Sequence, residues 1–256
     1  MGQTSLAGAI QLAGQDYLVS SSVQTMTLGA YAETADGRGF RYGKAVAATV
    51  AGKLYQCTPQ DATNYAPPGG LGVSAAAIGA TQVTLSSSVT IALNALAGGY
   101  LTAAITPGAG YAYKIKGNTA VSGATGCVIT LEDPLVVAFT TDTKVVMVAD
   151  PYLEVVIMPT TITAAPAGVA NSIIAEDEFG WFQTHGPCAV LNSGGTAIGL
   201  GITPGGAAGA VKTGATTLGD IGYCLNAGTT AEYQMVFLNI DWCSWYAQTL
   251  VIYSNG

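Results

Sequence analysis

Short runs of alternating apolar and polar residues, separated by turns of small residues, recur along the whole chain. In the clearest run Tyr111, Tyr113 and Ile115 fall on one side of an extended chain, and smaller or charged residues fall on the other. With the apolar run at 100–105 and the Pro/Gly turn between them, this predicts a half-buried β-hairpin. Helical periodicity free of Gly and Pro never extends beyond about ten residues, so the pattern predicts an all-β chain with little helix.

The spacing of these runs predicts several segments. Residues 80–159 hold short strands about 8–12 residues apart, the spacing of a β-sandwich or barrel, and are expected to form an inserted β domain. The weaker patterns on either side of it, at 36–79 and 160–240, predict one β-rich base domain. Extended terminal arms complete the chain, an N-terminal arm at 1–35 and an aromatic C-terminal tail at 241–256.

Two local features of the base domain are also predicted. The runs at 40–46 and 53–57 flank a turn and are expected to pair as a compact hairpin. Residues 160–172 are rich in Thr, Ala, Pro and Gly and carry no charge, so they are expected to form a linker or a second surface arm.

Ionisable residues are unusually rare. They make up 9% of the chain against about 25% in average globular proteins, while half the residues are apolar. Two explanations stay open: a surface of neutral polar residues, or a surface largely covered by other subunits, which we favour. The net charge is −7 and the eight Lys and Arg are scattered singly, which argues against direct nucleic-acid binding.

The same sequence predicts a protein made and assembled in a cytoplasm, outside the membrane. The first residues lack the basic region of a secretory signal, and no run of 18 apolar residues occurs without turn residues. The five cysteines are odd in number and widely spaced, so they are expected to be buried free thiols rather than a disulfide framework or metal knuckle: Cys57, Cys127, Cys188, Cys224 and Cys243.

Candidate catalytic groups are few, and we expect neither an enzyme nor a metal or cofactor site. His185 is the only histidine, and no nucleophile elbow accompanies it. The acidic pair Glu132 and Asp133 and the cluster at 176–178 adjoin turns, where solvated carboxylates are common. The glycine-rich stretch at 69–72 lacks the Gly-Lys-Ser/Thr and the helix of a phosphate loop.

Three stretches together resemble the head decoration, or capsid cement, proteins of tailed bacteriophages. They are residues 36–45 (DGRGFRYGKA) with 51–54 (AGKL), residues 180–190 (GWFQTHGPCAV) and residues 221–238 (IGYCLNAGTTAEYQMVFL). Residues 98–134 also resemble a module of phage virion proteins. The similarity covers about half the chain and consists of β-turns and aromatic residues.

This resemblance implies a β-rich homotrimer on the outside of a phage head, assembled in the host cytoplasm, where it clamps adjacent major capsid subunits. The family has no catalytic residues. On this basis the expected interface comprises the N-terminal arm and the following aromatic side chains: Phe40, Tyr42, Trp181, Phe182, Trp242, Trp245 and Tyr246.

Two alternatives remain open. The chain could be another virion component, although the repeats of a tail fibre and the long helix of the common shell subunit are both missing from its pattern. It could instead be a carbohydrate-binding module that uses Tyr and Trp as platforms.

Overall fold

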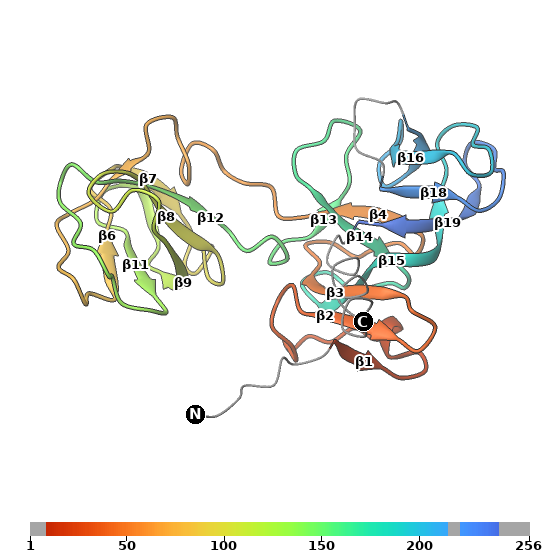
Figure 1. The fold of residues 1–256 in the computed structure, drawn as a ribbon, viewed down its shortest axis with the longest axis horizontal. Coiled ribbons are helices and arrows are strands. Elements are labelled where there is room, and N and C mark those ends of the chain that lie inside the picture. The colour runs from red at the N-terminus through yellow and green to blue at the C-terminus, as the bar shows by residue number, and fades with distance from the viewer. Residues whose placement is uncertain (1–8, 215–220, 241–256) are drawn as a thin grey trace, which may run out of the picture. The chain divides into compact units, whose positions relative to one another are not determined.

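The computed structural model describes residues 9–214 and 221–240, and these form nineteen strands and one 3₁₀ turn, Asp16–Leu18 (η1) (Figure 1). The prediction of an all-β chain is therefore confirmed. No helix of the described ranges has the length and apolar character needed to cross a membrane. The chain divides into two units, one formed by residues 58–151 (the inserted unit) and the other by residues 1–57 and 152–256 (the base unit).

The inserted unit is built on a six-stranded sheet and a separate strand pair. The sheet has the order β5-β12-β8-β9-β11-β6, and β7 pairs with β10. The strands are β5 Leu71–Gly72, β6 Gln82–Thr84, β7 Val89–Ile91, β8 Tyr100–Ile105, β9 Ala112–Asn118, β10 Val121–Ala124, β11 Val128–Leu131 and β12 Lys144–Val148. The predicted hairpin is β8 and β9, in which Tyr113 and Ile115 are buried while Tyr111 lies exposed just before β9.

The base unit is an eleven-stranded mixed sheet with the main order β1-β2-β3-β15-β19-β18-β16-β17; β4, β13 and β14 attach beside β15. Its strands are β1 Ile10–Leu12, β2 Tyr31–Thr34, β3 Gly39–Lys44, β4 Lys53–Gln56, β13 Val156–Ile157, β14 Pro166–Ala170, β15 Phe179–Leu191, β16 Gly201–Pro204, β17 Val211–Thr213, β18 Gly222–Cys224 and β19 Tyr233–Asn239.

Strand β15 connects the two halves of the base unit (Figure 1). Its first half pairs with β3 and, at Phe182 and Gln183, with β14; its second half, from His185 to Leu191, pairs with β19. A register shift between Gln183 and His185 marks the change of partner. Three separate hydrophobic clusters of the base unit each take a side chain from this strand: Trp181, Phe182 and Val190.

The boundaries between the two units differ from those that the sequence predicted. Leu71 and Val73 pack in the core of the inserted unit, and β5 pairs with β12, so residues 58–79 belong to that unit. Val155 and Met158 pack in clusters of the base unit, and β13 pairs with β4 there. The inserted unit thus covers residues 58–151 rather than 80–159.

Three further predictions about the base unit are wrong. The N-terminal arm was expected to hold one or two short strands, and β1 and β2 are such strands, but its described part is no free arm, because both join the sheet and Leu12 and Ala32 are buried. Strands β3 and β4 form no hairpin, because β3 pairs with β2 and β15 and β4 pairs with β13 and β14. Residues 160–172 are no simple linker, because β14 lies between β4 and β15 with Val169 buried.

Candidate interaction surface

Four of the aromatic residues expected at an interface lie in the interior of the base unit. Phe40 and Phe182 are fully buried, and Tyr42 and Trp181 are 3% and 6% exposed. Tyr42 meets the edge of the Trp181 ring at 5.0 Å between centroids. These side chains hold the sheet and the N-terminal segment together, and so they are core residues, unavailable to a partner while the unit is folded. Trp242, Trp245 and Tyr246 lie outside the described residues.

The structure exposes a different apolar surface, on one side of β15, β19 and β18. Side chains alternate strictly along β19: Gln234, Val236 and Leu238 are buried, while their neighbours point away from the core. Antiparallel pairing sets the outward residues of the three strands side by side. We call this surface the outer face, and it comprises Pro187, Ala189, Tyr223, Leu225, Tyr233, Met235 and Phe237.

The outer face is rich in large side chains that water reaches. Tyr233 is 52% exposed and Met235 is 42% exposed, and Tyr223 is exposed to a similar degree. The Tyr223 ring stacks on Phe237 with 5.2 Å between centroids and 6° between planes, and His185 meets the same Phe237 edge-on. Ile198 and Leu200, in the turn before β16, add further exposed apolar area beside β18.

Charged residues are missing from the strands that carry this surface. The hydrogen-bonded neighbours β15, β19, β18 and β16 contain no Asp, Glu, Lys or Arg. Contiguous exposed apolar area without charge is the mark of a surface that binds another macromolecule. The sequence predicted a β-rich domain here but did not reveal this face. The pattern that could have revealed the face is the alternation of Tyr233, Met235 and Phe237 with buried residues along β19.

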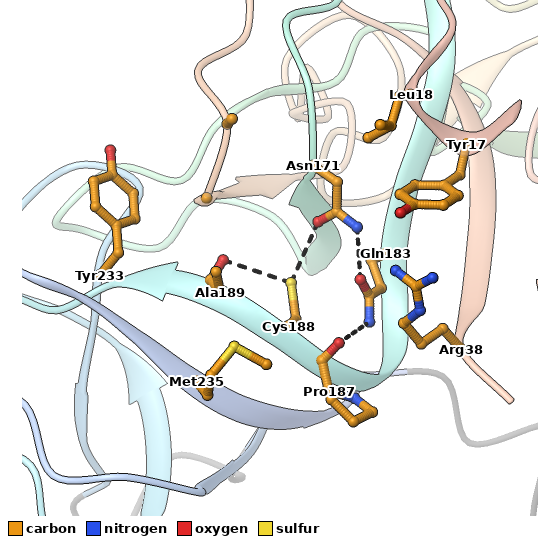
Figure 2. A pocket seen from close by; sticks show the side chains of 12 residues that line it. Tyr17, Leu18, Arg38, Asn171, Gln183, Pro187, Cys188, Ala189, Tyr233 and Met235 are labelled. Atoms are coloured by element: carbon orange, nitrogen blue, oxygen red, sulfur yellow. Dashed lines mark hydrogen bonds between the residues drawn. The ribbon is translucent and has the colours of Figure 1, made fainter. Parts of the chain in front are cut away.

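A groove of roughly 700 Å³ in the base unit continues the outer face (Figure 2). Pro187, Ala189, Tyr233 and Met235 line both. The Tyr233 ring lies directly over Gly52, where an added Cβ would come within 2.6 Å of it. The apolar surface therefore extends from β18 across β19 and β15 into this hollow.

The floor of the groove is a closed set of hydrogen bonds between neutral groups (Figure 2). Asn171 Nδ2 donates to Gln183 Oε1 at 2.7 Å, and Gln183 Nε2 donates to the Pro187 carbonyl oxygen at 2.9 Å. The Cys188 thiol donates to Asn171 Oδ1 at 3.4 Å. Burial raises the pKa of Cys188 to about 12. This thiol stays protonated at neutral pH and is a poor nucleophile.

Arg38 is the one cation that lines the described part of the groove. Its guanidinium lies 4.6 Å from the centre of the Tyr17 ring, and its Nε contacts Asp36 Oδ2 at 2.9 Å. Burial disfavours the charged form, but the Tyr17 hydroxyl and Asp36 outweigh this effect, and the pKa of Arg38 is raised. The guanidinium is thus already engaged within the protein.

The other candidate residues serve local structure. Asp177 pairs with Lys44 at 2.7 Å, and Glu178 accepts a hydrogen bond from Ser20. His185 contacts the Phe237 ring, and its Nδ1 has no hydrogen-bond partner among the described residues. Within the same residues, no three His, Cys, Asp or Glu side chains lie together as they would to hold a metal ion. Cys57, Cys127, Cys188 and Cys224 are buried free thiols, and Cys243 lies outside the described residues.

Comparisons with protein-family models, with curated proteins and with solved structures find no match to this chain.

Proposed function

We propose that this chain is a structural virion protein that decorates the outside of a tailed-phage head and stabilises contacts between major capsid subunits. The observation that carries the proposal is the uncharged outer face, with half-exposed Tyr233 and Met235 at its centre. Large apolar side chains left open to water by a folded unit favour a protein whose working state is an assembly. The resemblance of residues 36–45 with 51–54, 180–190 and 221–238 to decoration proteins supports the choice of assembly.

In this proposal the chain acts by burying surface rather than by catalysis. Copies associate with one another, as a homotrimer, and the trimer contacts the shell. Each lasting contact buries more than about 1,000 Å² in total, and many copies on one lattice gain further from avidity. The interface residues are therefore those of the outer face, in place of the buried aromatic set.

Binding to shells assembled without the protein tests this function. Purified chain is mixed with shells of the phage that encodes it, and the shells are pelleted at increasing protein concentration. We expect saturable co-sedimentation with a fixed number of copies per shell subunit, and shells that resist heat or low salt better than undecorated ones. Shells that pellet without the chain at every concentration would contradict the proposal. Binding to tails or fibres instead would favour another virion role.

A second candidate function is the binding of a sugar chain in the groove, which the half-exposed Tyr233 ring at its rim favours. The floor is less favourable, because the amides of Asn171 and Gln183 already bond each other and the backbone. A glycan array separates the two functions: a specific signal that Tyr233→Ala abolishes supports sugar binding, and a blank array supports the structural role.

A further inference from the structure

The groove of the base unit offers an occupant apolar contact rather than hydrogen bonds (Figure 2). The amides of Asn171 and Gln183 already bond each other and the backbone, and Arg38 is engaged within the protein. Apart from the floor and Arg38, the lining residues are aromatic, aliphatic or small: Tyr17, Leu18, Ala51, Gly52, Pro187, Ala189, Tyr233 and Met235. A group that settles there gains mainly by burying apolar surface, so the favoured occupant is apolar and uncharged.

The described chain ends beside this groove. Strands β14 and β19 lie on the same edge of β15, because β3 pairs along the opposite edge. The Ile240 N–H donates to the Thr184 carbonyl oxygen at 2.9 Å, and the next residue of β15, Gln183, is already paired with Val169 of β14. The chain therefore cannot continue along this edge and must leave it at residue 241. It does so next to Gln183, which is part of the groove floor.

The segment that follows has the composition that the groove favours. Residues 241–256 carry one charged side chain, Asp241, and no Glu, Lys, Arg or His. Their large apolar and aromatic side chains are Trp242, Trp245, Tyr246, Leu250, Val251, Ile252 and Tyr253. Aromatic side chains this dense require a surface to pack against, and the groove is an uncharged surface that begins where the segment begins.

Length and attachment also favour this segment over a separate partner. Residues 241–256 span up to about 50 Å when extended, whereas the groove follows β15 from Gln183 to Ala189, about 20 Å of strand. A segment tethered beside its site meets it at an effective concentration of the order of millimolar. Even modest apolar contacts are then enough to hold the segment in place.

We propose that the C-terminal segment 241–256 binds in the groove of its own chain, with its aromatic side chains against Tyr233, Met235 and the wall at Pro187 and Ala189. This inference goes beyond the proposed function and does not depend on it.

A bound segment extends the outer face instead of removing it. The groove of roughly 700 Å³ lies in the range of pockets that bury one molecule of drug size, about 300–1,000 Å³, and so it takes only a few of these side chains. The others add uncharged apolar surface beside β19. The exposed side chains at the β18 end, Tyr223 and Leu225, lie outside the groove and stay open to a neighbouring copy.

Disulfide trapping through Cys243, which belongs to the segment, tests this inference on the full chain. Pro187→Cys places a second thiol in the groove, and Tyr223→Cys is the matched control. Both positions pair with Phe237, one on each side of β19, so they are equally far from Ile240, and only Pro187 lines the groove. Each protein is oxidised with glutathione disulfide at roughly 1 µM. Mass spectrometry identifies the linked peptides, and non-reducing gels separate links within a chain from links between chains.

We expect Pro187→Cys to form a disulfide with Cys243 of its own chain at least about tenfold faster than Tyr223→Cys does. Equal rates for the two folded proteins overturn the inference. A link from Pro187→Cys to Cys243 of another chain also overturns it, because the segment then occupies the groove of a neighbouring copy. No shell is present in this experiment, so failure here leaves the proposed function standing, and shells that do not bind the chain leave this inference standing.

Quenching of tryptophan emission by acrylamide provides a second measurement that needs no added cysteine. Trp181 is 6% exposed, so quenching reports mainly on Trp242 and Trp245. Met235→Lys places a charge in the groove, and Tyr223→Lys places one at an equally exposed position outside it. We expect Met235→Lys to lose protection from acrylamide and Tyr223→Lys to keep the protection of wild type. The same quenching in all three proteins, with circular dichroism showing that each is folded, overturns the inference.

Discussion

Phe182 and Trp181 are adjacent on β15 and yet both are buried, because this half of the strand is covered on both sides. Phe182 packs with Tyr55, at 5.6 Å between ring centroids, and Trp181 packs with Tyr42 beneath the N-terminal segment. An aromatic pair in a strand indicates burial, but residue type alone cannot tell whether the covering atoms come from the same chain or a partner. That is why the sequence placed these residues at an interface.

Phe182→Ala should destabilise the base unit by about 3–5 kcal/mol, the usual cost of emptying a fully buried aromatic site. Chemical denaturation gives this free energy of unfolding. Val23→Ala, at a position 67% exposed, should stay within about 0.5 kcal/mol of wild type. A Phe182→Ala protein as stable as wild type but unable to associate would restore the interface role of this residue.

The buried Cys188 thiol makes the free energy of unfolding of the base unit depend on pH in the alkaline range. Burial raises its folded-state pKa to about 12, above that of an exposed thiol, so the unfolded chain loses this proton first as pH rises. The stability that the protonated thiol supplies is complete below the unfolded pKa and is lost as pH climbs toward the folded value. The pH window of this loss is therefore about 9 to 12.

The free energy of unfolding should fall by about 1.4 kcal/mol per pH unit more in wild type than in Cys188→Ala above roughly pH 9. Denaturation curves of both proteins at several pH values measure the difference, and the subtraction cancels the titration of other groups. Equal slopes for the two proteins would show that the Cys188 thiol ionises freely in the folded state.

Strands in which apolar and polar residues alternate were predictable from the sequence, as β8, β9 and β19 show. Strand β14 was not, because Pro166, Gly168 and small neighbours suggest a loop. Gly168 has φ +144°, and an added Cβ would lie 2.8 Å from the Gln183 carbonyl oxygen. The strand exists because small residues fit between β4 and β15. These neighbours are distant in the sequence, so the local pattern of residues does not indicate the strand. The predicted hairpin of β3 and β4 is absent for the same reason, because both strands pair with partners that are distant in the sequence.

Gly168→Ala should therefore destabilise the base unit by about 2 kcal/mol or more, through backbone strain and the clash with β15. Gly195→Ala is the matched control, because no atom lies within 4 Å of its added Cβ. Thermal melts compare the two. A Gly168→Ala protein that melts with its control would mean that β14 shifts to admit the methyl group at little cost.

At the scale of the whole molecule, one unit is inserted into the other. The core of the inserted unit comes from residues between Leu71 and Ala149. Its two ends are hydrogen-bonded to each other, with the Thr58 N–H donating to the Pro151 carbonyl oxygen at 2.8 Å. An insertion was predictable from the regular strand spacing. Its boundaries were not, because the Pro- and Gly-rich residues 58–72 suggest a loop and yet supply the buried side chain of Leu71.

Residues 58–151 expressed alone should fold and unfold cooperatively, because their core and paired ends are complete without the base unit. Dispersed amide resonances and a single thermal transition would confirm this. In the complementary protein, a short Gly/Ser linker joins Cys57 to Tyr152, and it should keep the oligomeric state of wild type. A fragment without dispersed resonances would show that the inserted unit needs the base unit to fold.

Electron cryomicroscopy of purified virions tests most directly the claim that this chain works as an assembled part of a phage head. We expect ordered density on the outer surface of the head, at threefold or quasi-threefold positions, into which copies of the base unit fit with β15, β19 and β18 facing a neighbouring copy. Heads whose outer surface lacks this density, or density for the chain elsewhere in the virion, would contradict it.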